Sequence, residues 1–210
     1  MYRKGLKRAF DAGVSLLFLT LFLFPLGLGL LFLKMTMGGP VFFRQVRIGR
    51  FGRRFSLIKL RTMAPNNWAN HITVSNDPRL TAVGCFLRKF KLDEIPQLWN
   101  VLKGEMSLVG PRPDVPGYSD LLTGDDRRIL LLRPGITGPA SLKYADEENL
   151  LARAADPVAY NDTVIYPDKV RINLRYAEEY GFGRDLRYLL KTAICALWPV
   201  RCGGAERPGT

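Results

Sequence analysis

Hydrophobic residues run almost without interruption from position 12 to position 33, and this is the strongest pattern in the chain. A continuous helix of about 22 residues is long enough to cross a bilayer core of roughly 30 Å. Residues 33–37 offer no small-residue cleavage site, and the apolar part is too long for a signal peptide. The segment therefore predicts a retained membrane anchor.

Two details bear on whether this anchor spans the membrane. Pro25 lies near its middle and removes one helical hydrogen bond, so we expect a kink there. Lysine and arginine residues flank the segment on both sides, and by the positive-inside rule both flanks prefer the cytoplasm. A kinked helix that re-enters the same face satisfies both flanks, and an ordinary bent spanning helix is the alternative.

Other patterns follow the anchor. Residues 41–48 and 55–61 are rich in β-branched and aromatic side chains around a turn at 49–52, which predicts a β-hairpin. Residues 80–103 are helical in composition apart from Gly84 and Pro96, with a helix start predicted at Asp77 and Pro78. Near the C-terminus an apolar stripe at helical spacing suits either a core helix or a helix in the membrane interface. The stripe comprises Leu186, Leu189, Leu190, Ala193, Ile194, Leu197 and Trp198.

Composition narrows the classes of partner. The net charge of +12 and the sequence pI near 9.9 imply anionic partners. The membrane anchor favours an anionic lipid surface and phosphorylated substrates over nucleic acid. The three cysteines are too few and too scattered for a disulfide framework, so we expect reduced thiols.

Asp93 and Glu94 are adjacent carboxylates beside a basic run at 88–91. Two acids next to fixed cations can stay ionised at neutral pH and can hold a metal or attack an electrophile. Pro96 is tolerated in the first turn of a new helix, which places both acids at or just before a helix N-terminus. Backbone N–H groups at such an end favour a phosphate.

Two stiff turns each present an arginine. Residues 110–113 read Gly-Pro-Arg-Pro, and residues 133–138 read Arg-Pro-Gly-Ile-Thr-Gly. A guanidinium held in this way binds phosphate oxygens bidentately with little entropy left to lose. Taken singly, each turn is more typical of a structural loop.

These motifs also carry a wider resemblance, through residues 55–63, 77–81, 92–101, 106–113, 133–138 and 165–173. Together they resemble the bacterial sugar transferase family, in particular its small monotopic polyprenol-phosphate phosphoglycosyl transferases. The resemblance implies transfer of a phosphosugar from a nucleoside diphosphate sugar, which we expect to be a UDP-sugar, to a polyprenol phosphate such as undecaprenyl phosphate. The products would be polyprenol-diphosphate-sugar and nucleoside monophosphate, in the first membrane step of surface glycan or glycoprotein glycan assembly.

The resemblance also implies the site residues. The family's acidic pair falls on Asp93 and Glu94, its basic residue on Lys59, and another functional acid on Asp168. Side-chain chemistry agrees, because Asp93 can form a covalent phosphosugar intermediate as a nucleophile, and Glu94 with Asp93 can hold Mg²⁺. We expect the substrate phosphates to be bound by Arg61, Arg88, Arg112 and Arg133, together with the flanking residues Pro111 and Pro113.

We therefore expect a predominantly α fold with a small β-hairpin. Its parts would be a re-entrant membrane helix over 1–35, a compact catalytic domain with interfacial amphipathic helices over 36–200, and a flexible tail over 201–210. The catalytic domain would lie on the cytoplasmic face of the bacterial inner membrane. Two positions depart from the family pattern: Phe24 precedes Pro25 where relatives have serine, and residues 139–142 differ in a way that bears on the sugar accepted.

Two other classes of protein remain alternatives. A membrane-anchored scaffold that binds anionic lipid would explain the charge but would leave Asp93 and Glu94 idle. A lipid phosphatase or kinase would also use acids and arginines, yet the sequence has no Gly-rich P-loop. Release of nucleoside monophosphate from a sugar nucleotide separates these classes.

Overall fold

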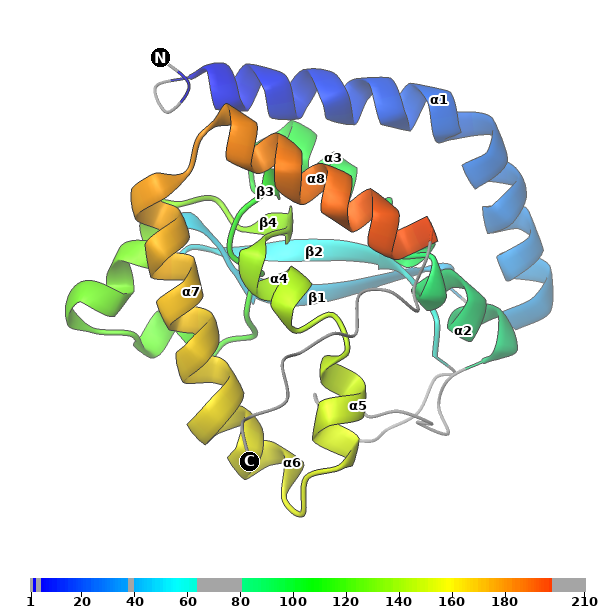
Figure 1. Ribbon diagram of the computed structural model, residues 1–210. Coiled ribbons are helices and arrows are strands. Elements are labelled where there is room, and N and C mark those ends of the chain that lie inside the picture. Colours follow the sequence, from blue (N-terminus) through cyan, green and yellow to red (C-terminus); the bar gives the residue numbers. More distant parts are fainter. Residues whose placement is uncertain (1, 3–4, 38–39, 64–80, 198–210) are drawn as a thin grey trace.

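A computed structural model of the protein describes residues 2, 5–37, 40–63 and 81–197. Most of this part is helical, as predicted, and Figure 1 shows the helices arranged around two small sheets. The α-helices are α1 (Leu6–Met37), α2 (Ala82–Lys89), α3 (Gln97–Lys103), α4 (Pro139–Lys143), α5 (Glu147–Ala152), α6 (Pro157–Tyr160), α7 (Tyr166–Glu179) and α8 (Phe182–Leu197). The 3₁₀ helices are η2 (Arg50–Gly52), η3 (Leu92–Glu94), η4 (Ser119–Leu121) and η5 (Gly124–Leu131), and η6 (Asn161–Ile165) is a π-helix.

The predicted β-hairpin is confirmed. Strands β1 (Phe42–Ile48) and β2 (Arg54–Leu60) pair antiparallel, with Phe42 opposite Leu60 and Ile48 opposite Arg54. The structure adds a second sheet that the sequence analysis missed, in which β3 (Ser107–Val109) pairs parallel with β4 (Gly135–Thr137). Each of these strands has three residues, which is too short for a visible alternation of apolar and polar positions.

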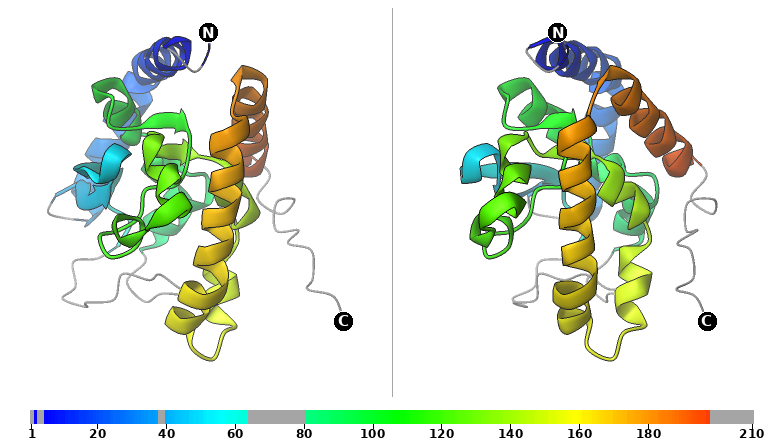
Figure 2. Two further views of the ribbon diagram at one scale, coloured as in Figure 1. Left: turned by 90° about the vertical axis from the view of Figure 1, so that its left-hand side faces the viewer. Right: turned by 60° about the vertical axis from the view of Figure 1, so that its left-hand side comes forward.

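The main core forms where β2, α3, β3 and α7 meet. Its buried members are Phe55, Leu57, Val101, Met106, Leu108, Val109 and Tyr176. Helix α1 contributes Phe10 and Val14 to this core, and α8 contributes Tyr188 and Leu189. Figure 2 shows α7 running away from α8 along one side of the molecule, with α6 at its far end. The first and last described helices therefore share one core.

Helix α1 extends over the part of the molecule that holds α3 and α8, and it changes direction part-way along its length (Figure 1). A kink at Pro25 itself stays a prediction. Within residues 2, 5–37, 40–63 and 81–197, no helix is both long enough and apolar enough to span a membrane.

The predicted stripe of α8 divides between two environments. Leu189 packs against the core, whereas Leu186, Leu190, Ile194 and Leu197 are 40–75% exposed. Of the two alternatives, a core helix does not hold for these four residues, and a helix in the membrane interface stays a prediction. Trp198, the last predicted member, lies outside the described residues.

Three other sequence predictions need correction or lie beyond the structure. Of the two exceptions within the helical composition of 80–103, Gly84 lies inside α2, whereas Pro96 directly precedes α3 as expected; α2 ends at Lys89. Cys85 is a free thiol, but Cys195 is disulfide-bonded, so the prediction of reduced thiols is wrong for Cys195. The predicted start at residues 77 and 78 and the tail at 201–210 lie outside the described residues.

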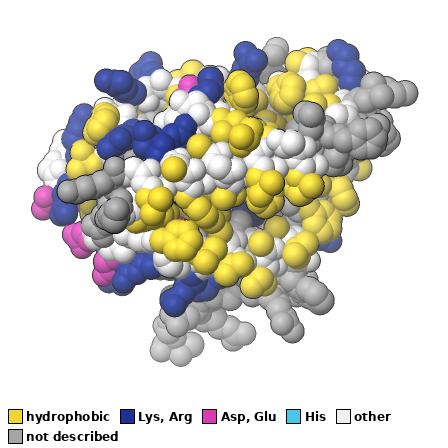
Figure 3. Space-filling view, turned by 90° about the horizontal axis from the view of Figure 1, so that it is seen from above, with side chains coloured by type: hydrophobic (Ala, Val, Ile, Leu, Met, Phe, Trp, Pro, Cys, Tyr) yellow, Lys and Arg dark blue, Asp and Glu magenta, His cyan; other side chains and the backbone are white. Residues whose placement is uncertain are grey.

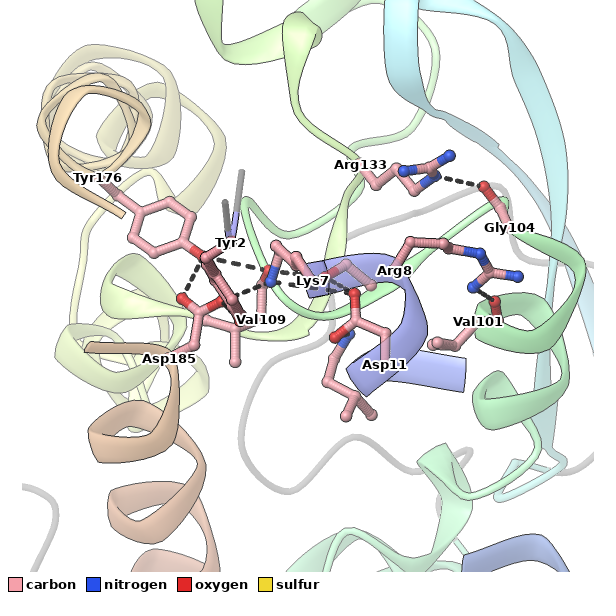
Figure 4. Close-up of polar contacts among 12 residues, drawn as sticks. Tyr2, Lys7, Arg8, Asp11, Val101, Gly104, Val109, Arg133, Tyr176 and Asp185 are labelled. Carbon is pink, nitrogen blue, oxygen red and sulfur yellow. Dashed lines mark hydrogen bonds and ion pairs between the residues drawn. The ribbon is translucent and has the colours of Figure 1, made fainter. Parts of the chain in front are cut away.

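A buried charge network joins the two ends of the described chain (Figure 4). The Asp185 carboxylate, 1% exposed, accepts hydrogen bonds of 2.6 Å from Lys7 Nζ, Tyr2 Oη and Tyr176 Oη. Asp11 of α1 is also buried and accepts a hydrogen bond of 2.7 Å from Ser107 Oγ of β3. Lys7 is thus the cation that compensates buried acid at the contact between α1 and α8.

We predict that Lys7→Met strongly destabilises the fold, because it leaves the Asp185 carboxylate buried without its cation. Breaking a buried ion pair by removing one partner costs about 3–5 kcal/mol. The free energy of unfolding, measured by chemical denaturation in detergent, checks this. The matched control is Arg184→Met, which breaks an exposed pair with Glu179 and should cost less than about 1 kcal/mol. Equal losses in the two variants would contradict the prediction.

Candidate active site

Six of the predicted site residues meet in one cavity of about 930 Å³. Its walls come from the β1–β2 hairpin, the end of α2, η3, the Gly-Pro-Arg-Pro turn, α4, α5 and α7. The predicted residues among its lining are Lys59, Arg61, Arg88, Asp93, Glu94 and Arg112. This volume is large enough for a substrate of cofactor size.

Helix α2 is placed by its contact with the end of β2. Thr81 caps the helix by accepting a hydrogen bond of 2.9 Å from Gly84 N, and Thr81 N donates to Thr62 O at 3.2 Å. A Cβ atom on Gly84 would lie 1.9 Å from Thr62 O, so only glycine permits this approach. As a result Arg88, one turn further along, reaches the cavity and donates from Nε to Thr62 Oγ1 at 3.1 Å.

The acidic pair lies in the turn between α2 and α3, as the sequence predicted. Lys91 adopts a left-handed conformation (φ 54°), which ends α2 and redirects the chain into η3. Asp93 and Glu94 follow in η3, and Pro96 precedes the first residue of α3. The left-handed turn, which the sequence did not reveal, is what points both acids at the cavity.

Glu94 is held between two cations. Lys59 Nζ lies 3.1 Å and Arg112 Nη2 lies 3.3 Å from Glu94 Oε1. Burial by itself would raise the pKa of Glu94, but the charges of Lys59 and Arg112 outweigh it and lower that pKa to about 2. Glu94 is therefore a fixed negative charge.

Asp93 has a different environment although it is the adjacent residue. Its side chain is buried, and among the described residues it makes no hydrogen bond or ion pair. Burial raises the pKa of Asp93, while the charge of Lys59 opposes this rise. A buried carboxylate without a bonded partner is a better nucleophile than one held in an ion pair.

The two Gly/Pro turns pack directly on each other. Gly110 N donates to Thr137 O at 2.9 Å, and Gly135 N donates to Pro111 O at 2.7 Å. A Cβ atom on Gly135 would lie 2.1 Å from Gly110 N, so no larger residue fits. Pro111 and Pro113 are buried in this arrangement, whereas Arg112 between them reaches the cavity. The two prolines therefore act through the position of Arg112.

Besides the two buried prolines, two predicted site residues lie outside the cavity lining. Arg133 Nε donates to Gly104 O at 2.9 Å, at the C-terminal end of α3 (Figure 4). Asp168 accepts hydrogen bonds of 2.7 Å from Lys143 and Tyr144, and from Arg171; these bonds outweigh its burial and lower its pKa to about 2. Asp168 thus orients Tyr144, which does line the cavity. Catalysis by Asp168 and phosphate binding by Arg133 stay predictions.

The cavity also contains polar residues that the sequence analysis did not single out. They are Arg47, Asp114, Ser141, Tyr144, Tyr166, Lys169 and Asn173. Burial raises the pKa of Asp114 to about 6, although the charges of Lys169 and Arg47 oppose this rise. One signal was present, because Asp114 directly follows the Gly-Pro-Arg-Pro motif and positions 166, 169 and 173 recur at helical spacing.

Comparison with known proteins identifies the family. The model of the bacterial sugar transferase family matches residues 2–199. The chain belongs to this family. It is 33% identical to the UDP-galactose-lipid carrier transferase of Erwinia amylovora, over 89% of this chain and 39% of the relative. It is 34% identical to the undecaprenyl-phosphate galactose phosphotransferase of Salmonella typhimurium, over 91% of this chain and 40% of the relative.

Other relatives are closer in length to this chain. The exopolysaccharide production protein ExoY of Rhizobium meliloti is 35% identical, over 90% of this chain and 85% of the relative. By contrast, the chain spans about two fifths of the length of the two galactose transferases that it matches. The family match over residues 2–199 includes the residues that line the cavity.

We predict that Lys59→Met raises the pKa of both acids of η3, because the charge of Lys59 is the strongest influence that lowers each of them. Infrared titration of the ¹³C-labelled aspartate and glutamate carboxyl groups measures this. The matched control is Lys103→Met, which removes an exposed cation paired with Glu105. This variant should leave the pKa values of Asp93 and Glu94 unchanged. Unchanged pKa values in Lys59→Met would show that Lys59 does not control the charge of the pair.

Proposed function

We propose that this chain is a phosphoglycosyl transferase that moves a phosphosugar from a nucleoside diphosphate sugar to polyprenol phosphate. One observation carries the proposal: a buried carboxylate without a bonded partner, Asp93, adjoins a carboxylate fixed by Lys59 and Arg112 in a cavity lined by cations. The names of the Erwinia and Salmonella relatives support a donor that carries a sugar and an acceptor that is a lipid phosphate. A UDP-sugar as the donor is part of the proposal.

The reaction would proceed in two steps. In the first, a carboxylate oxygen of Asp93 attacks the phosphorus that bears the sugar, and the bond from that phosphorus to the bridging oxygen breaks. Nucleoside monophosphate leaves with the bonding electrons, and a phosphosugar remains on Asp93 as an acyl-phosphate. In the second step, a phosphate oxygen of the polyprenol phosphate attacks the same phosphorus, and the Asp93 carboxylate is released.

The cations of the cavity would carry the electrostatic part of catalysis. Arg88, Arg112 and Lys59 face a diphosphate whose charge shifts onto the leaving monophosphate, and fixed charges in a water-poor site stabilise such a change most. Arg112 is already oriented by its buried prolines and by Glu94, so little reorganisation accompanies the reaction. Asp93 would form the covalent bond to phosphorus, and the neighbouring cations would compensate the negative charge of the diphosphate.

The residues present fit a Mg²⁺ ion, which we propose as the cofactor. Among the described residues no group of three or more metal-ligating side chains occurs, and Mg²⁺ commonly takes only one or two carboxylates besides substrate phosphates and water. Both ion pairs of Glu94 end on Oε1, so in the described part Oε2 is available alongside Asp93. Bound there, the ion would neutralise diphosphate charge.

We further propose that α1 and α8 hold the protein on the membrane, with the catalytic part on the cytoplasmic face. Viewed from the side where these helices lie, apolar side chains gather among lysine and arginine residues (Figure 3). The exposed apolar residues of the two helices are Leu6, Leu16, Leu17, Phe18, Leu21, Leu186, Leu190, Ile194 and Leu197. An apolar surface of this kind with a basic surround suits the boundary between lipid headgroups and acyl chains.

We predict that the enzyme, given the correct sugar nucleotide without polyprenol phosphate, releases up to one equivalent of nucleoside monophosphate. The peptide that carries Asp93 should gain the mass of a phosphosugar, measured by mass spectrometry. Asp93→Asn should lose both signals while it still folds, because an amide of the same shape does not attack phosphorus at a useful rate. The matched control is Asp125→Asn, since Asp125 is exposed and lies outside the cavity lining.

The same experiment tests the other parts of the proposal. EDTA should abolish the release and added Mg²⁺ should restore it; full release in EDTA would remove the metal from the mechanism. Transfer that requires both substrates together and leaves no adduct would overturn the role of Asp93 as a nucleophile. If the wild-type protein releases no monophosphate from any sugar nucleotide, the membrane scaffold becomes the better explanation.

We predict that both ends of α1 face the cytoplasm. Single cysteines introduced at positions 3 and 36, in a background that lacks the native cysteines, should react with a membrane-impermeant thiol reagent only after the inner membrane is opened. A cysteine at position 120, in the catalytic part, provides the control for a cytoplasmic site. Labelling of position 3 alone from the periplasm would contradict the re-entrant arrangement and favour the spanning helix.

A further inference from the structure

A second set of polar groups lines the cavity beyond the acidic pair. Asp114 follows the Gly-Pro-Arg-Pro turn, Ser141 lies on α4, and Tyr166 and Asn173 lie on α7. None of these residues has a role in the two steps described above. They come from three separate elements, so their meeting in one wall reflects the fold and not a local sequence motif.

Asp114 is held in place through its backbone. Ile48 N donates to Asp114 O at 2.9 Å, and Arg47 Nη1 donates to Pro113 O at 3.0 Å. Its side chain accepts a hydrogen bond from Ser119, but in the described part of the chain no cation lies within ion-pair distance of it. The nearby cation Lys169 is bonded to Glu147 at 2.6 Å instead. The carboxylate therefore keeps capacity for further donors.

The rest of this wall has unmet hydrogen-bonding capacity. Ser141 Oγ, Tyr166 Oη and Asn173 Oδ1 are buried and have no hydrogen-bond partner among the described residues. Leaving such a group unpaired costs about 1–3 kcal/mol, so buried polar atoms nearly always have partners. All three belong to residues that line one cavity, where a polar ligand is available to complete their bonds.

Arg112 connects this wall to the site of reaction. It pairs with Glu94 at 3.3 Å, and its charge also acts on Asp114. The wall is thus next to the place where the diphosphate would lie. A carboxylate at that position repels further phosphate but accepts hydrogen bonds from neutral hydroxyl groups. The ligand group that fits is a polyhydroxyl part joined directly to the diphosphate.

We propose that Asp114, with Asn173, forms a hydroxyl-binding subsite that selects the donor. This inference rests on the proposed function. The hydroxyl groups of the transferred sugar and those of the ribose share the required chemistry, and the experiment separates the two sources. A site built to hydrogen-bond a substrate hydroxyl discriminates strongly against a donor that misplaces it, because its buried polar groups are then left unpaired.

The test compares Asp114→Asn with Asp125→Asn, the control that removes the same charge outside the cavity. Monophosphate release is measured as kcat/KM for UDP-glucose and UDP-galactose, which differ at one hydroxyl, and UDP is measured as a competitive inhibitor. In Asp114→Asn we expect kcat/KM for the preferred donor to fall by at least about 10-fold. Loss of the preference between the two sugars with unchanged inhibition by UDP identifies the sugar hydroxyls. Weaker inhibition by UDP with the preference retained identifies the ribose.

The remaining outcomes decide against the inference. If Asp114→Asn retains both the preference and the inhibition by UDP, the subsite is wrong although the proposed function stands. If the wild-type protein uses no sugar nucleotide, the proposed function fails and the subsite fails with it. Thermal unfolding checks each variant. Should Asp114→Asn not fold, Asn173→Leu, which replaces the amide with an apolar side chain of the same branching, is judged by the same two measurements.

Discussion

The close approach of two backbone segments, residues 107–110 and 135–138, is the constraint on which the rest of the structure depends. Glycine at 110 and 135 allows β3 and β4 to pair where any side chain would clash. From this short sheet Ser107 reaches Asp11 of α1, and Val109 O accepts a hydrogen bond from Tyr176 of α7. The same pairing sets the turn that carries Arg112. The pairing of β3 with β4 thus positions α1, α7 and the turn that forms one wall of the cavity.

The local environment shifts the pKa values of the two adjacent carboxylates, Asp93 and Glu94, in opposite directions. Glu94 meets two cations and stays ionised, whereas burial dominates at Asp93. A pair of titratable groups with opposite pKa shifts is a common sign of divided roles in an active site. In this protein the division arises from backbone direction, because η3 turns Glu94 toward Lys59 and Arg112 and leaves the preceding Asp93 without a bonded partner among the described residues. The sequence order alone contains no such asymmetry.

Much of the fold could be predicted from the sequence where a pattern is long enough to be periodic. The hairpin and the C-terminal helix are of this kind. Pro96 alone indicated the start of α3, and Asp93, Glu94, Lys59 and Arg112 do meet. The three-residue strands β3 and β4 and the left-handed conformation of Lys91 produce no periodic pattern in the sequence. Arg133 and Asp168 illustrate a different limit: a motif identifies the residue type, but the direction of the side chain depends on packing between distant elements. Asp114 was missed although it directly follows the Gly-Pro-Arg-Pro motif, because an acid in a loop shows no periodic spacing.

The buried contact between Lys7 and Asp185 also has a consequence for biosynthesis. The two residues are 178 positions apart, so the ribosome makes α1 long before its acidic partner in α8. At roughly 5–20 residues per second, about 10 to 35 s separate them. During that interval Lys7 has no Asp185 to pair with, so α1 cannot yet take its final position against α8. The order of translation therefore makes closure of this charge network one of the last steps of folding.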